Sequence, residues 1–389
     1  MKQKTIFIDG LGLVDGHFSG VGQYILGILQ GLDQLAEAAY RKGQPFPQIR
    51  VIVPRDTVSK FRRFGFKHID HKVFPLPFRY VATLWHRGKL PPIDLWCGRG
   101  VYIFPRFVGM PLLFSKSANV IFDLSYELHR DFSDEQNARF LSEGVKRTLK
   151  KSEKVIAISK NAKQEIEDFY KLPAHKVVVA TPATDYRSFY RRSPQEIERV
   201  KRKYGIKGDY ILALSNLEPR KNLGALVNAY CKLPKSITDN TALLLVGVSG
   251  WKTEALFKDI VRRVEKGANI IRPSKYVSDK DKPAIISGAK LLVYPSHYEG
   301  FGMPTLEALA CGVPVVAADN SSLPEVVGTA ATLVPSGDND ALYEAVAGAL
   351  AHNQQLSDKT LVAGPLQALN FSWTKSAQVF LDVAKELSE

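Results

Sequence analysis

Short apolar runs rich in β-branched residues recur along the whole chain, and longer stretches of helical character separate them. Such runs predict strands that are buried on both faces, and their alternation with helices predicts parallel sheets covered by helices on both sides. The expected strands lie near residues 5–8, 50–53, 72–74, 95–96, 102–104, 119–122, 155–158, 177–180, 210–214, 242–246, 270–272, 291–294, 313–317 and 331–333. The fold class is therefore α/β, with Rossmann-like, doubly wound sheets.

The alternation of strands and helices breaks once, between residues 181 and 204. Pro182, Pro194 and the charged stretch 190–192 favour a linker between domains there, and a length of 389 residues is typical of two domains. We expect one domain over residues 1–190, a second over 191–365, and an amphipathic helix within 366–389 that closes back on the first. The two sheets would then face each other across a central cleft, with the carboxyl ends of their strands toward it.

Several classes of protein are excluded by what the sequence lacks. The three cysteines (Cys97, Cys231 and Cys311) are scattered without metal-ligand spacing, so neither a zinc site nor a disulfide framework is expected. The first residues carry no signal-peptide core, and no apolar run approaches the roughly 18 residues of a membrane span. We therefore expect a cytoplasmic protein.

The chain is strongly basic, with a net charge of +14 from 53 basic and 39 acidic residues. Residues 51–100 hold 10 basic and 3 acidic side chains, and segment 58–87 mixes these cations with aromatic residues. This mixture favours peripheral contact with an anionic membrane at the inner face of the plasma membrane. The alternative is a solvated basic surface whose aromatic side chains turn into the core. No recognition motif accompanies the charge, so nucleic acid is not an expected partner.

The most informative stretch of the sequence follows the apolar run 291–294. Pro304 suits the first position of a helix, and Gly312 suits the residue just after its end. Between strand and helix, the main-chain amides of Gly300, Phe301, Gly302 and Met303 have no strand or helix partner. Free amides at the positive end of a helix are typical of a phosphate site.

A carboxylate stands on each side of these amides. Glu299 precedes them and Glu307 lies one turn into the helix. Because a carboxylate repels phosphate, we expect both side chains to accept hydrogen bonds from uncharged hydroxyls, those of a ribose at one end and of a sugar at the other. The ligand that fits this arrangement is a nucleotide sugar, whereas the alternative is a plain glycine-rich turn with two surface glutamates.

Two adjacent cations, Arg220 and Lys221, follow the apolar run 210–214 and would lie at the mouth of the same sheet. An Arg/Lys pair can stabilise a diphosphate leaving group without a metal ion. No Asp-x-Asp pair occurs in a plausible metal setting, so we expect neither a catalytic metal ion nor any other cofactor.

These residues resemble a known family. Glu299 and Glu307 match the Glu-x7-Glu motif of the large retaining glycosyltransferase family 4, which has the two-domain GT-B fold, and segment 219–222 resembles its phosphate-binding segment. Segments 314–318 and 324–328 also resemble later parts of that family. The resemblance implies that Glu307 holds the donor ribose and Glu299 the hydroxyls of the transferred sugar. It also implies that the diphosphate is held by the side chains of Arg220 and Lys221 and by the main-chain amides of Phe301, Gly302, Met303, Pro304 and Thr305.

The first half carries fainter parts of the same resemblance. The stretch 15–24, with Gly20 and Gly22, resembles the family's glycine-rich loop, which faces the donor diphosphate and the acceptor; the alternative is a tight turn only. Asp123 stands at a strand end, where we expect it to orient the acceptor hydroxyl.

The sequence departs from the family pattern at two positions. Phe122 stands where the family often has a histidine, and His17 and His129 are the candidates to replace that histidine. We also expect Asn216 to bind the donor. Many relatives carry a basic residue at this position, so here Arg220 and Lys221 alone would neutralise the charge of the phosphates.

The expected function is a metal-independent, retaining hexosyl transfer from a nucleotide-diphosphate sugar to a glycan or lipid-linked glycan. Segment 217–222 resembles that of bacterial polysaccharide mannosyl- and rhamnosyltransferases, which favours GDP-mannose as donor and cell-surface polysaccharide as product. The alternative is a non-catalytic module that keeps a GT-B fold and binds an anionic glycan or a membrane.

Overall fold

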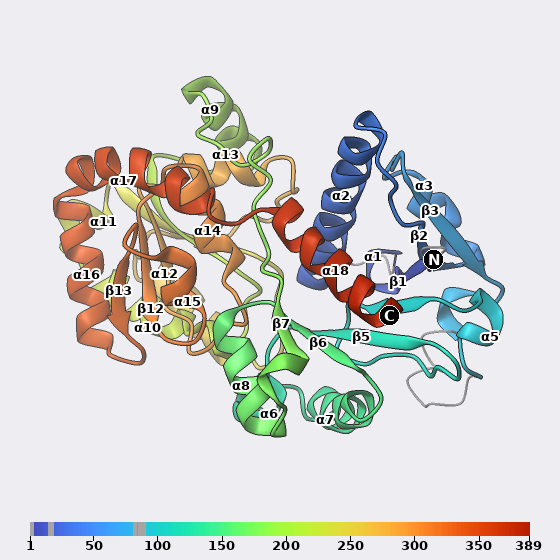
Figure 1. Cartoon of the computed structure of the whole chain (residues 1–389). Coiled ribbons are helices and arrows are strands. Elements are labelled where there is room, and N and C mark those ends of the chain that lie inside the picture. The colour runs from blue at the N-terminus through green and yellow to red at the C-terminus, as the bar shows by residue number, and fades with distance from the viewer. Residues whose placement is uncertain (1–3, 15–18, 81–83, 85–90) are drawn as a thin grey trace. The chain divides into compact units, whose positions relative to one another are not determined.

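The computed structural model describes residues 4–14, 19–80, 84 and 91–389, and it divides into two compact units (Figure 1). Unit 1 comprises residues 1–182 together with 372–389, and unit 2 comprises residues 183–371. The chain thus leaves unit 1 once, builds unit 2 and returns to unit 1 for its last helix.

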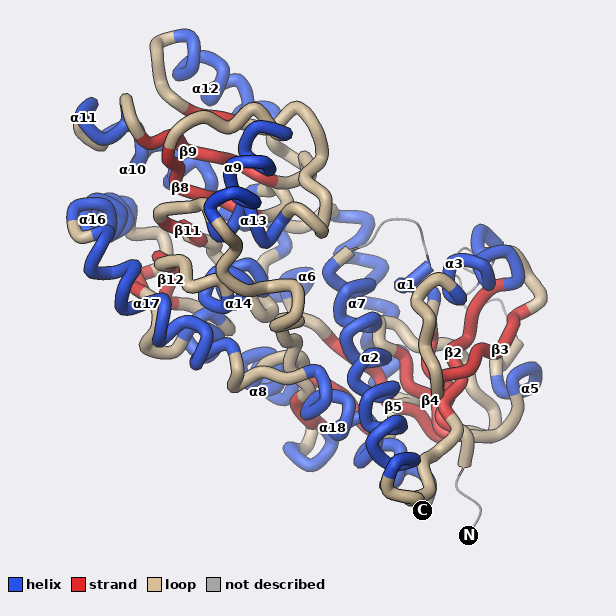
Figure 2. Tube along the Cα trace, turned by 90° about the horizontal axis from the view of Figure 1, so that it is seen from above, coloured by secondary structure: helices blue, strands red, loops and turns tan. Residues whose placement is uncertain are grey.

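Each unit is built on a parallel sheet, as the apolar runs predict (Figure 2). Among the described residues of unit 1 the strand order is β3-β2-β1-β4-β5-β6-β7, and in unit 2 it is β10-β9-β8-β11-β12-β13. The strands of unit 1 are β1 Ile6–Asp9, β2 Ile49–Pro54, β3 Ile69–Phe74, β4 Val101–Phe104, β5 Lys116–Ile121, β6 Lys154–Ala157 and β7 Val177–Val179. Those of unit 2 are β8 Asp209–Leu214, β9 Thr241–Val246, β10 Ile270–Ile271, β11 Leu291–Tyr294, β12 Val315–Asp319 and β13 Thr332–Pro335.

Helices connect these strands. In the described residues of unit 1, the α-helices are α1 Leu11–Val14, α2 Gly20–Arg41, α3 Val58–Arg62, α5 Asp94–Cys97, α6 Ser125–Leu128, α7 Glu135–Leu149, α8 Lys160–Tyr170 and α18 Trp373–Ser388. The helices of unit 2 are α9 Pro194–Lys203, α10 Leu223–Lys232, α11 Lys235–Thr238, α12 Glu254–Glu265, α13 Lys282–Ser287, α14 Met303–Ala310, α15 Leu323–Val327, α16 Asn339–Ala351 and α17 Asn353–Ala368. The serine that the sequence marks as the cap of α8, Ser159, accepts a hydrogen bond from the amide of Ala162.

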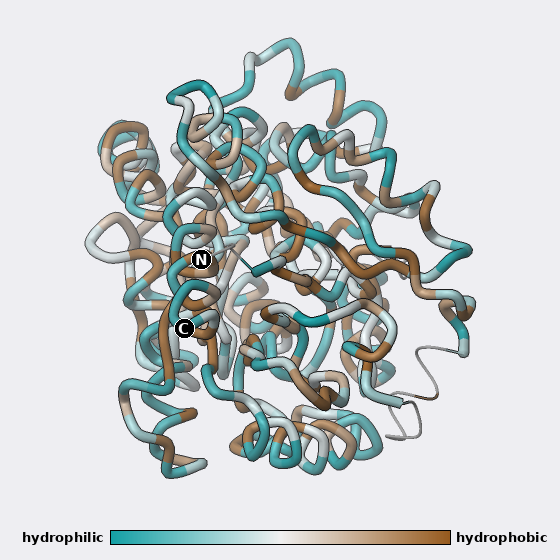
Figure 3. Tube along the Cα trace, turned by 45° about the vertical axis from the view of Figure 1, so that its right-hand side comes forward, coloured by the Kyte–Doolittle hydropathy of each residue, from teal (hydrophilic) through white to brown (hydrophobic). Residues whose placement is uncertain are grey.

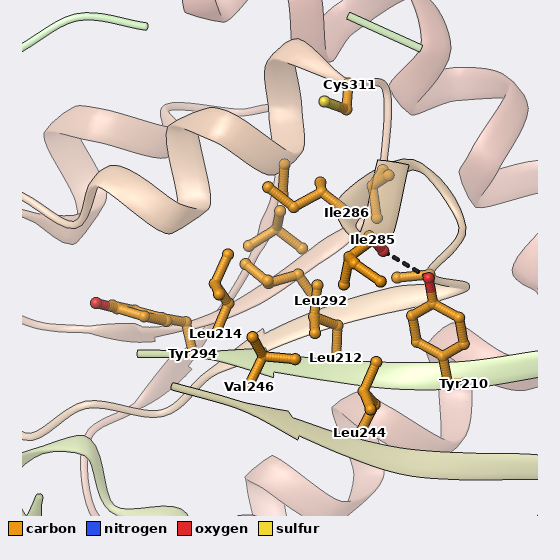
Figure 4. Close-up of a cluster of buried hydrophobic side chains, with 14 of the residues drawn as sticks. Tyr210, Leu212, Leu214, Leu244, Val246, Ile285, Ile286, Leu292, Tyr294 and Cys311 are labelled. Atoms are coloured by element: carbon orange, nitrogen blue, oxygen red, sulfur yellow. Dashed lines mark hydrogen bonds between the residues drawn. The ribbon is translucent and has the colours of Figure 1, made fainter. Parts of the chain in front are cut away.

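The core of unit 2 lies on both faces of its sheet. Along β8, Tyr210, Leu212 and Leu214 belong to one buried cluster, whereas Ile211 and Ala213 belong to another. Because successive side chains of a strand point to opposite faces, this alternation places a core layer on each side of the strand. Figure 4 shows the first cluster, where the Tyr210 hydroxyl donates to the carbonyl of Ile285 at 2.6 Å. In Figure 3 many of the outer loops are coloured as hydrophilic.

The last helix, α18, packs along α2 within unit 1 (Figure 1). Two glycines of α2 make the close approach possible: a Cβ at Gly27 would lie 2.2 Å from the Trp373 ring, and one at Gly31 would lie 2.4 Å from the Trp373 carbonyl oxygen. Tyr24 of α2 packs edge-on against the ring of Trp373, with centroids 5.8 Å apart. The Ser376 hydroxyl of α18 donates to the carbonyl of Thr181 at 2.6 Å.

Residues 183–204 of the segment expected to be a linker belong to unit 2, so the first boundary lies between residues 182 and 183 and not after residue 190. Phe189 already packs against the core of unit 2, and the amide of Arg192 donates to Ser287 at 3.1 Å. Pro194 begins α9, because the preceding Ser193 caps the helix by accepting from the amide of Glu196. The second boundary lies between residues 371 and 372, after the predicted 365/366, since α17 continues to Ala368 in unit 2.

One predicted strand is wrong. Residues 95–96 lie in the single turn of α5 rather than in a strand. The buried carboxylate of Asp94 accepts hydrogen bonds from the amides of Leu113, Phe114 and Ser115, which fixes this turn against a second loop. Leu95 and Trp96 are therefore largely exposed, not part of a sheet.

Candidate active site

The site that the sequence predicts in unit 2 lies where the strand order reverses. From β8 the chain proceeds outward through β9 to β10, and β11 then pairs with the other edge of β8. In open parallel sheets, ligands bind beyond the carboxyl ends of the strands at such a point. The loops that follow β8 and β11 carry Arg220 with Lys221 and Glu299 with the glycine-rich segment.

Main-chain and side-chain bonds join the two loops directly. The amide of His297 donates to the carbonyl of Arg220 at 2.8 Å, and the Arg220 guanidinium donates to the carbonyl of Tyr298 at 3.1 Å. The loop after β8 is also fixed from its other side, because the amide of Leu217 donates to Val248 and that of Gly250 donates to Leu217. Residues separated by about 80 positions in sequence are thus held as one structure.

Glycine is required in that second contact. A Cβ at Gly247 would lie 1.7 Å from the carbonyl oxygen of Ser215, and one at Gly250 would lie 2.8 Å from that of Leu217. The two main chains can approach each other only because no side chain stands between them. Asn216, between these contacts, has an exposed side chain.

Lys221 and Glu299 form a buried ion pair at the centre of the site. The Lys221 Nζ lies 2.5 Å from the Glu299 Oε1, and both side chains are under 10% exposed, at 8% and 7%. Lys221 also donates to the Tyr294 hydroxyl at 3.2 Å. Arg220 lies 3.5 Å from the other Glu299 oxygen and 2.9 Å from the carboxylate of Glu218. Two cations and two carboxylates therefore lie together with little of their surface exposed to solvent.

This arrangement keeps Glu299 ionised. Burial by itself would raise the pKa of the Glu299 carboxyl, but the adjacent Lys221 and Arg220 outweigh it and lower that pKa below its ordinary value. A carboxylate held in this state accepts hydrogen bonds and cannot donate them. This chemistry suits the binding of sugar hydroxyls, the role predicted for Glu299, which stays a prediction.

The glycine-rich segment supplies unpaired amides at the four residues where the sequence predicts them, but not at the two further residues that the family resemblance includes. Among the described residues, no hydrogen bond uses the amides of Gly300, Phe301, Gly302 or Met303. The Thr305 amide, by contrast, donates to the Gly302 carbonyl at 3.0 Å, and Pro304 has no amide hydrogen. The amides available to a phosphate are therefore those of residues 300–303.

Packing fixes the shape of this segment. Gly302 has a φ of 99°, and a Cβ there would lie 2.5 Å from Leu323. The Phe301 ring is buried edge-on against Phe371, with centroids 5.4 Å apart. Helix α14 begins at Met303, so Pro304 occupies its second position and not the first, and Gly312 follows its end with a φ of 67° as expected.

Glu307 lies on the buried side of α14 and pairs with a residue that the sequence did not reveal. Lys282, at the start of α13, donates to the Glu307 Oε1 at 2.9 Å. Burial raises the pKa of the Glu307 carboxyl above its ordinary value, although Lys282 opposes the shift. Lys282 also lies 5.1 Å from the centroid of the Phe189 ring.

Other residues of the site also escaped the sequence analysis. Glu218, Tyr294 and Ser321 contact the predicted residues, and the Ser321 hydroxyl accepts a hydrogen bond from the Glu299 amide at 2.9 Å. Glu218 adjoins Arg220 in sequence, so a buried carboxylate beside the cations could have been considered. Lys282 and Ser321 had no local signal, because only the fold brings α13 and the β12–α15 loop to this edge of the sheet.

The residues predicted in the first half lie in unit 1. Gly20 begins α2, and the amide of Gly22 donates to the hydroxyl of its cap, Ser19, at 3.4 Å. The carboxylate of Asp123 accepts hydrogen bonds from the amide and the hydroxyl of Ser125, at 3.0 and 2.8 Å, just before α6. His17 lies outside the described residues.

Phe122 is buried and packs between two aromatic rings. A side chain of the core therefore stands where the family often has a histidine. Its centroid lies 5.3 Å from that of Tyr24 and 5.4 Å from that of Phe107. His129 stacks on Phe132 at the end of α6, with centroids 6.1 Å apart. Phe122 is therefore part of the core of unit 1.

The structure describes residues 58–80 and 84 of the basic segment 58–87. The other residues of this segment lie outside the described residues. Phe61 is buried and packs against Phe66, whereas Arg62, Arg63 and Lys67 are exposed. No helix in the described parts of the chain is both long enough and apolar enough to cross a membrane.

Comparison with known proteins identifies the family. The family described as "Glycosyl transferases group 1" matches residues 195–360. The O-antigen chain mannosyltransferase B of Escherichia coli is 32% identical over 274 residues, which is 70% of this chain and 71% of the relative. The serotype-specific mannosyltransferase WbdA of Escherichia coli is 27% identical over 60% of this chain, but this covers only 29% of that longer protein.

Solved structures agree on the fold. A crystal structure of HepE from Anabaena, in complex with UDP and glucose, superposes over 100% of both chains with a TM-score of 0.69 and 16% identity. WaaG, a glycosyltransferase involved in lipopolysaccharide biosynthesis, gives a TM-score of 0.66 with 15% identity over 98% of this chain and 99% of the other. The two parallel sheets thus have the GT-B fold, which confirms the predicted fold class. The chain belongs to the glycosyl transferases group 1 family and is a glycosyltransferase, so the alternative of a non-catalytic module is not retained.

Proposed function

We propose that this glycosyltransferase moves a mannosyl unit from GDP-mannose to a glycan or lipid-linked glycan during the synthesis of a cell-surface polysaccharide. The observation that carries the donor assignment is the buried Lys221–Glu299 pair beside the unpaired amides of residues 300–303. Cations and amides suit a diphosphate, and ionised carboxylates suit sugar hydroxyls. The mannosyl group is supported by the names of the two Escherichia coli relatives, both mannosyltransferases.

In the proposed reaction, the bond between the sugar C1 and the diphosphate oxygen breaks while C1 bonds to the acceptor hydroxyl oxygen on the same face. Arg220, Lys221 and the amides stabilise the negative charge that develops on the leaving diphosphate, which makes a metal ion unnecessary. The leaving diphosphate takes the proton of the acceptor hydroxyl, so no strongly basic side chain is required. Asp123 orients that hydroxyl, and Glu307 binds the donor ribose.

The site imposes a rearrangement when the donor binds. Lys221 and Arg220 are engaged by Glu299 and Glu218 in the free protein. A diphosphate must draw part of their hydrogen bonding to itself, and Glu299 then has oxygen lone pairs available for the sugar. The same residues that bind the diphosphate would thus expose the carboxylate that binds the hexose.

A panel of nucleotide sugars tests the donor. GDP-mannose at 1 mM is expected to raise the melting temperature by several degrees, and UDP-glucose and ADP-glucose should raise it less, because a ligand that binds only the folded state stabilises it by mass action. The Glu307→Gln variant should lose most of this shift, since it replaces a carboxylate oxygen that accepts from the ribose with an amide group that donates. Glu344→Gln, on α16 of the same unit, is the matched control. A larger shift with a UDP-sugar would overturn the choice of nucleotide, and no shift with any donor would overturn the site.

We also propose that the basic segment 58–87 places the enzyme on an anionic membrane, at the inner face of the plasma membrane. Arg62, Arg63 and Lys67 are exposed on the described part of the segment. Nearby in unit 1, Trp96 and Phe114 are exposed apolar side chains, 55% and 56% accessible. Exposed aromatic residues and cations together are typical of contact with the membrane interface.

Vesicle sedimentation tests the membrane proposal. Replacing Arg62, Arg63 and Lys67 with glutamine should weaken binding to vesicles containing phosphatidylglycerol by about 100-fold, at about 1 kcal/mol for each cation. Binding of the unchanged protein should also decline with added salt, because salt screens exposed charges. A triple variant in which Arg139, Lys150 and Lys151, exposed residues of unit 1 outside segment 58–87, are replaced with glutamine serves as control. Equal vesicle binding by both variants would reject the proposal.

A further inference from the structure

Unit 1 contains a pocket of about 500 Å³ at the carboxyl ends of three neighbouring strands. Val14 ends α1, which follows β1; Arg55 and Lys60 come directly after β2; and Arg79 comes shortly after β3. Because β3, β2 and β1 are adjacent in the sheet, these three connections meet at one edge. The pocket therefore occupies the edge at which parallel sheets bind ligands.

The polar lining of the pocket is mainly cationic. Of the described residues that line it, Arg55, Lys60 and Arg79 have exposed side chains, and Asp56 is the one acidic residue. The carboxylate of Asp56 is already engaged, since its Oδ1 accepts a hydrogen bond from the amide of Phe78 at 2.9 Å. The pocket thus has an excess of positive charge.

Contacts with neighbouring residues orient two of these cations. The Lys60 Nζ donates to the carbonyl of Val14 at 3.2 Å, which ties α3 to α1 across the pocket. Arg79 stacks on the ring of Tyr80 with its guanidinium carbon 4.6 Å from the ring centroid. Cations whose side chains are already oriented lose less conformational freedom when they bind an anion.

Apart from Thr57, whose hydroxyl donates to the carbonyl of Pro54 at 2.9 Å, the remaining described lining is apolar. Val14 is buried, and Pro77 and Phe78 are half-buried beside the cations. An aromatic ring and a proline next to cationic groups suit a ligand that joins an anionic group to a ring with apolar faces, such as a phosphate attached to a sugar. A bare inorganic anion would use only the cationic part of this lining.

We propose that this pocket binds a phosphate group attached to the acceptor, with the neighbouring sugar against Phe78. The inference rests on the proposed function, because it assigns the second substrate of the same transfer and narrows its class to phosphorylated glycans. Guanidinium and ammonium groups bind a phosphate strongly through charge-assisted hydrogen bonds. The phosphate can belong to a soluble sugar phosphate or to the diphosphate of a lipid-linked sugar, and the two share this chemistry.

Binding of mannose 1-phosphate to the intact protein tests the pocket, measured by calorimetry with and without saturating GDP. GDP occupies the donor site of unit 2, so binding that persists in its presence reports on a separate site. We expect mannose 1-phosphate to bind and unphosphorylated mannose to bind at least 10-fold more weakly. The Arg55→Gln/Arg79→Gln variant should weaken mannose 1-phosphate binding by at least about tenfold, since each lost charge-assisted bond is worth roughly that factor.

Three comparisons keep the result interpretable. Arg55→Lys retains the charge, and lysine also binds phosphate as a point charge, so affinity should stay within about threefold of the original protein. Arg139→Gln, exposed on α7 of the same unit, removes a cation far in sequence from the pocket and should leave the affinity unchanged. A polyprenyl-diphosphate-linked mannose in detergent micelles distinguishes the two sources: a tenfold loss of its binding in the double variant with no loss for the soluble phosphate assigns the lipid-linked source.

The outcomes separate this inference from the donor assignment. If GDP binds and the double variant binds both phosphorylated probes as tightly as the original protein, the pocket assignment is overturned and the proposed function stands. If GDP fails to bind while the double variant still loses tenfold in mannose 1-phosphate affinity, the donor assignment fails and the pocket remains a phosphate site.

Discussion

Replacing Lys221 with methionine is expected to lower the rate of sugar transfer by about 10²- to 10³-fold, the usual loss when one group that stabilises transition-state charge is removed. Lys221 is buried and lies 2.5 Å from Glu299, so no solvent cation can take its place. Initial rates of GDP release in the presence of acceptor measure the effect. A variant that keeps more than one third of the original rate would contradict the role assigned to Lys221.

The same variant should also be less stable. Removing Lys221 leaves Glu299 buried with only Arg220 nearby, at 3.5 Å, and breaking a buried pair from one side costs about 3–5 kcal/mol. Urea unfolding measures this loss. In the Lys221→Met/Glu299→Gln double variant the uncompensated charge is gone, so most of the stability should return while transfer stays low. Recovery of both properties would indicate that Lys221 acts only in folding.

Replacing Gly31 with valine is expected to detach α18 from α2. A Cβ at this position would lie 2.4 Å from the Trp373 carbonyl oxygen and 2.9 Å from the Ala377 Cβ, and neither a carbonyl nor a helix backbone can move aside without shifting α18. We expect the free energy of unfolding to fall by about 3 kcal/mol, at the upper end of the usual cost of overpacking. Unfolding curves followed by near-UV circular dichroism measure this change.

Detachment has a second readout. Protease should cut near residues 369–373 faster in the Gly31→Val variant, because α18 no longer protects its own connection. The matched control is Gly348→Ala in α16, where a Cβ meets no atom within 4 Å and the helix should gain up to about 1 kcal/mol. If Gly31→Val retains the original stability and cleavage rate, the contact between α2 and α18 is not the close one described.

The sequence predicts well those parts of the molecule in which local pattern and tertiary environment agree. Buried parallel strands require continuous apolar runs, so nearly every such run became a strand, and the residues just after 214 and 294 reached the same edge of the sheet. The prediction of a strand at residues 95–96 was wrong because two apolar residues are equally compatible with a strand and with a turn. The hydrogen bonds between Asp94 and a loop distant in sequence select the turn.

The candidate site shows the same division. Glu299, Glu307, Arg220 and Lys221 could be singled out because each lies next to a strand end or a helix start that the sequence already marks. The partner of Glu307 could not, because Lys282 reaches it from another helix and its spacing from Glu307 follows no local rule. Pro194 was taken as a break in structure, although its neighbour Ser193 makes the same pair of residues a helix start.

The order in which the chain builds the two units determines which gene segments can be exchanged between related enzymes. Unit 2 is one uninterrupted stretch, residues 183–371, whereas unit 1 is assembled from two stretches that only meet after folding. A gene fragment ending at residue 182 would lack the helix that covers Tyr24, Gly27 and Gly31. Exchange of donor-binding modules between such enzymes therefore requires two crossovers that leave the final 18 residues, 372–389, with their original first half.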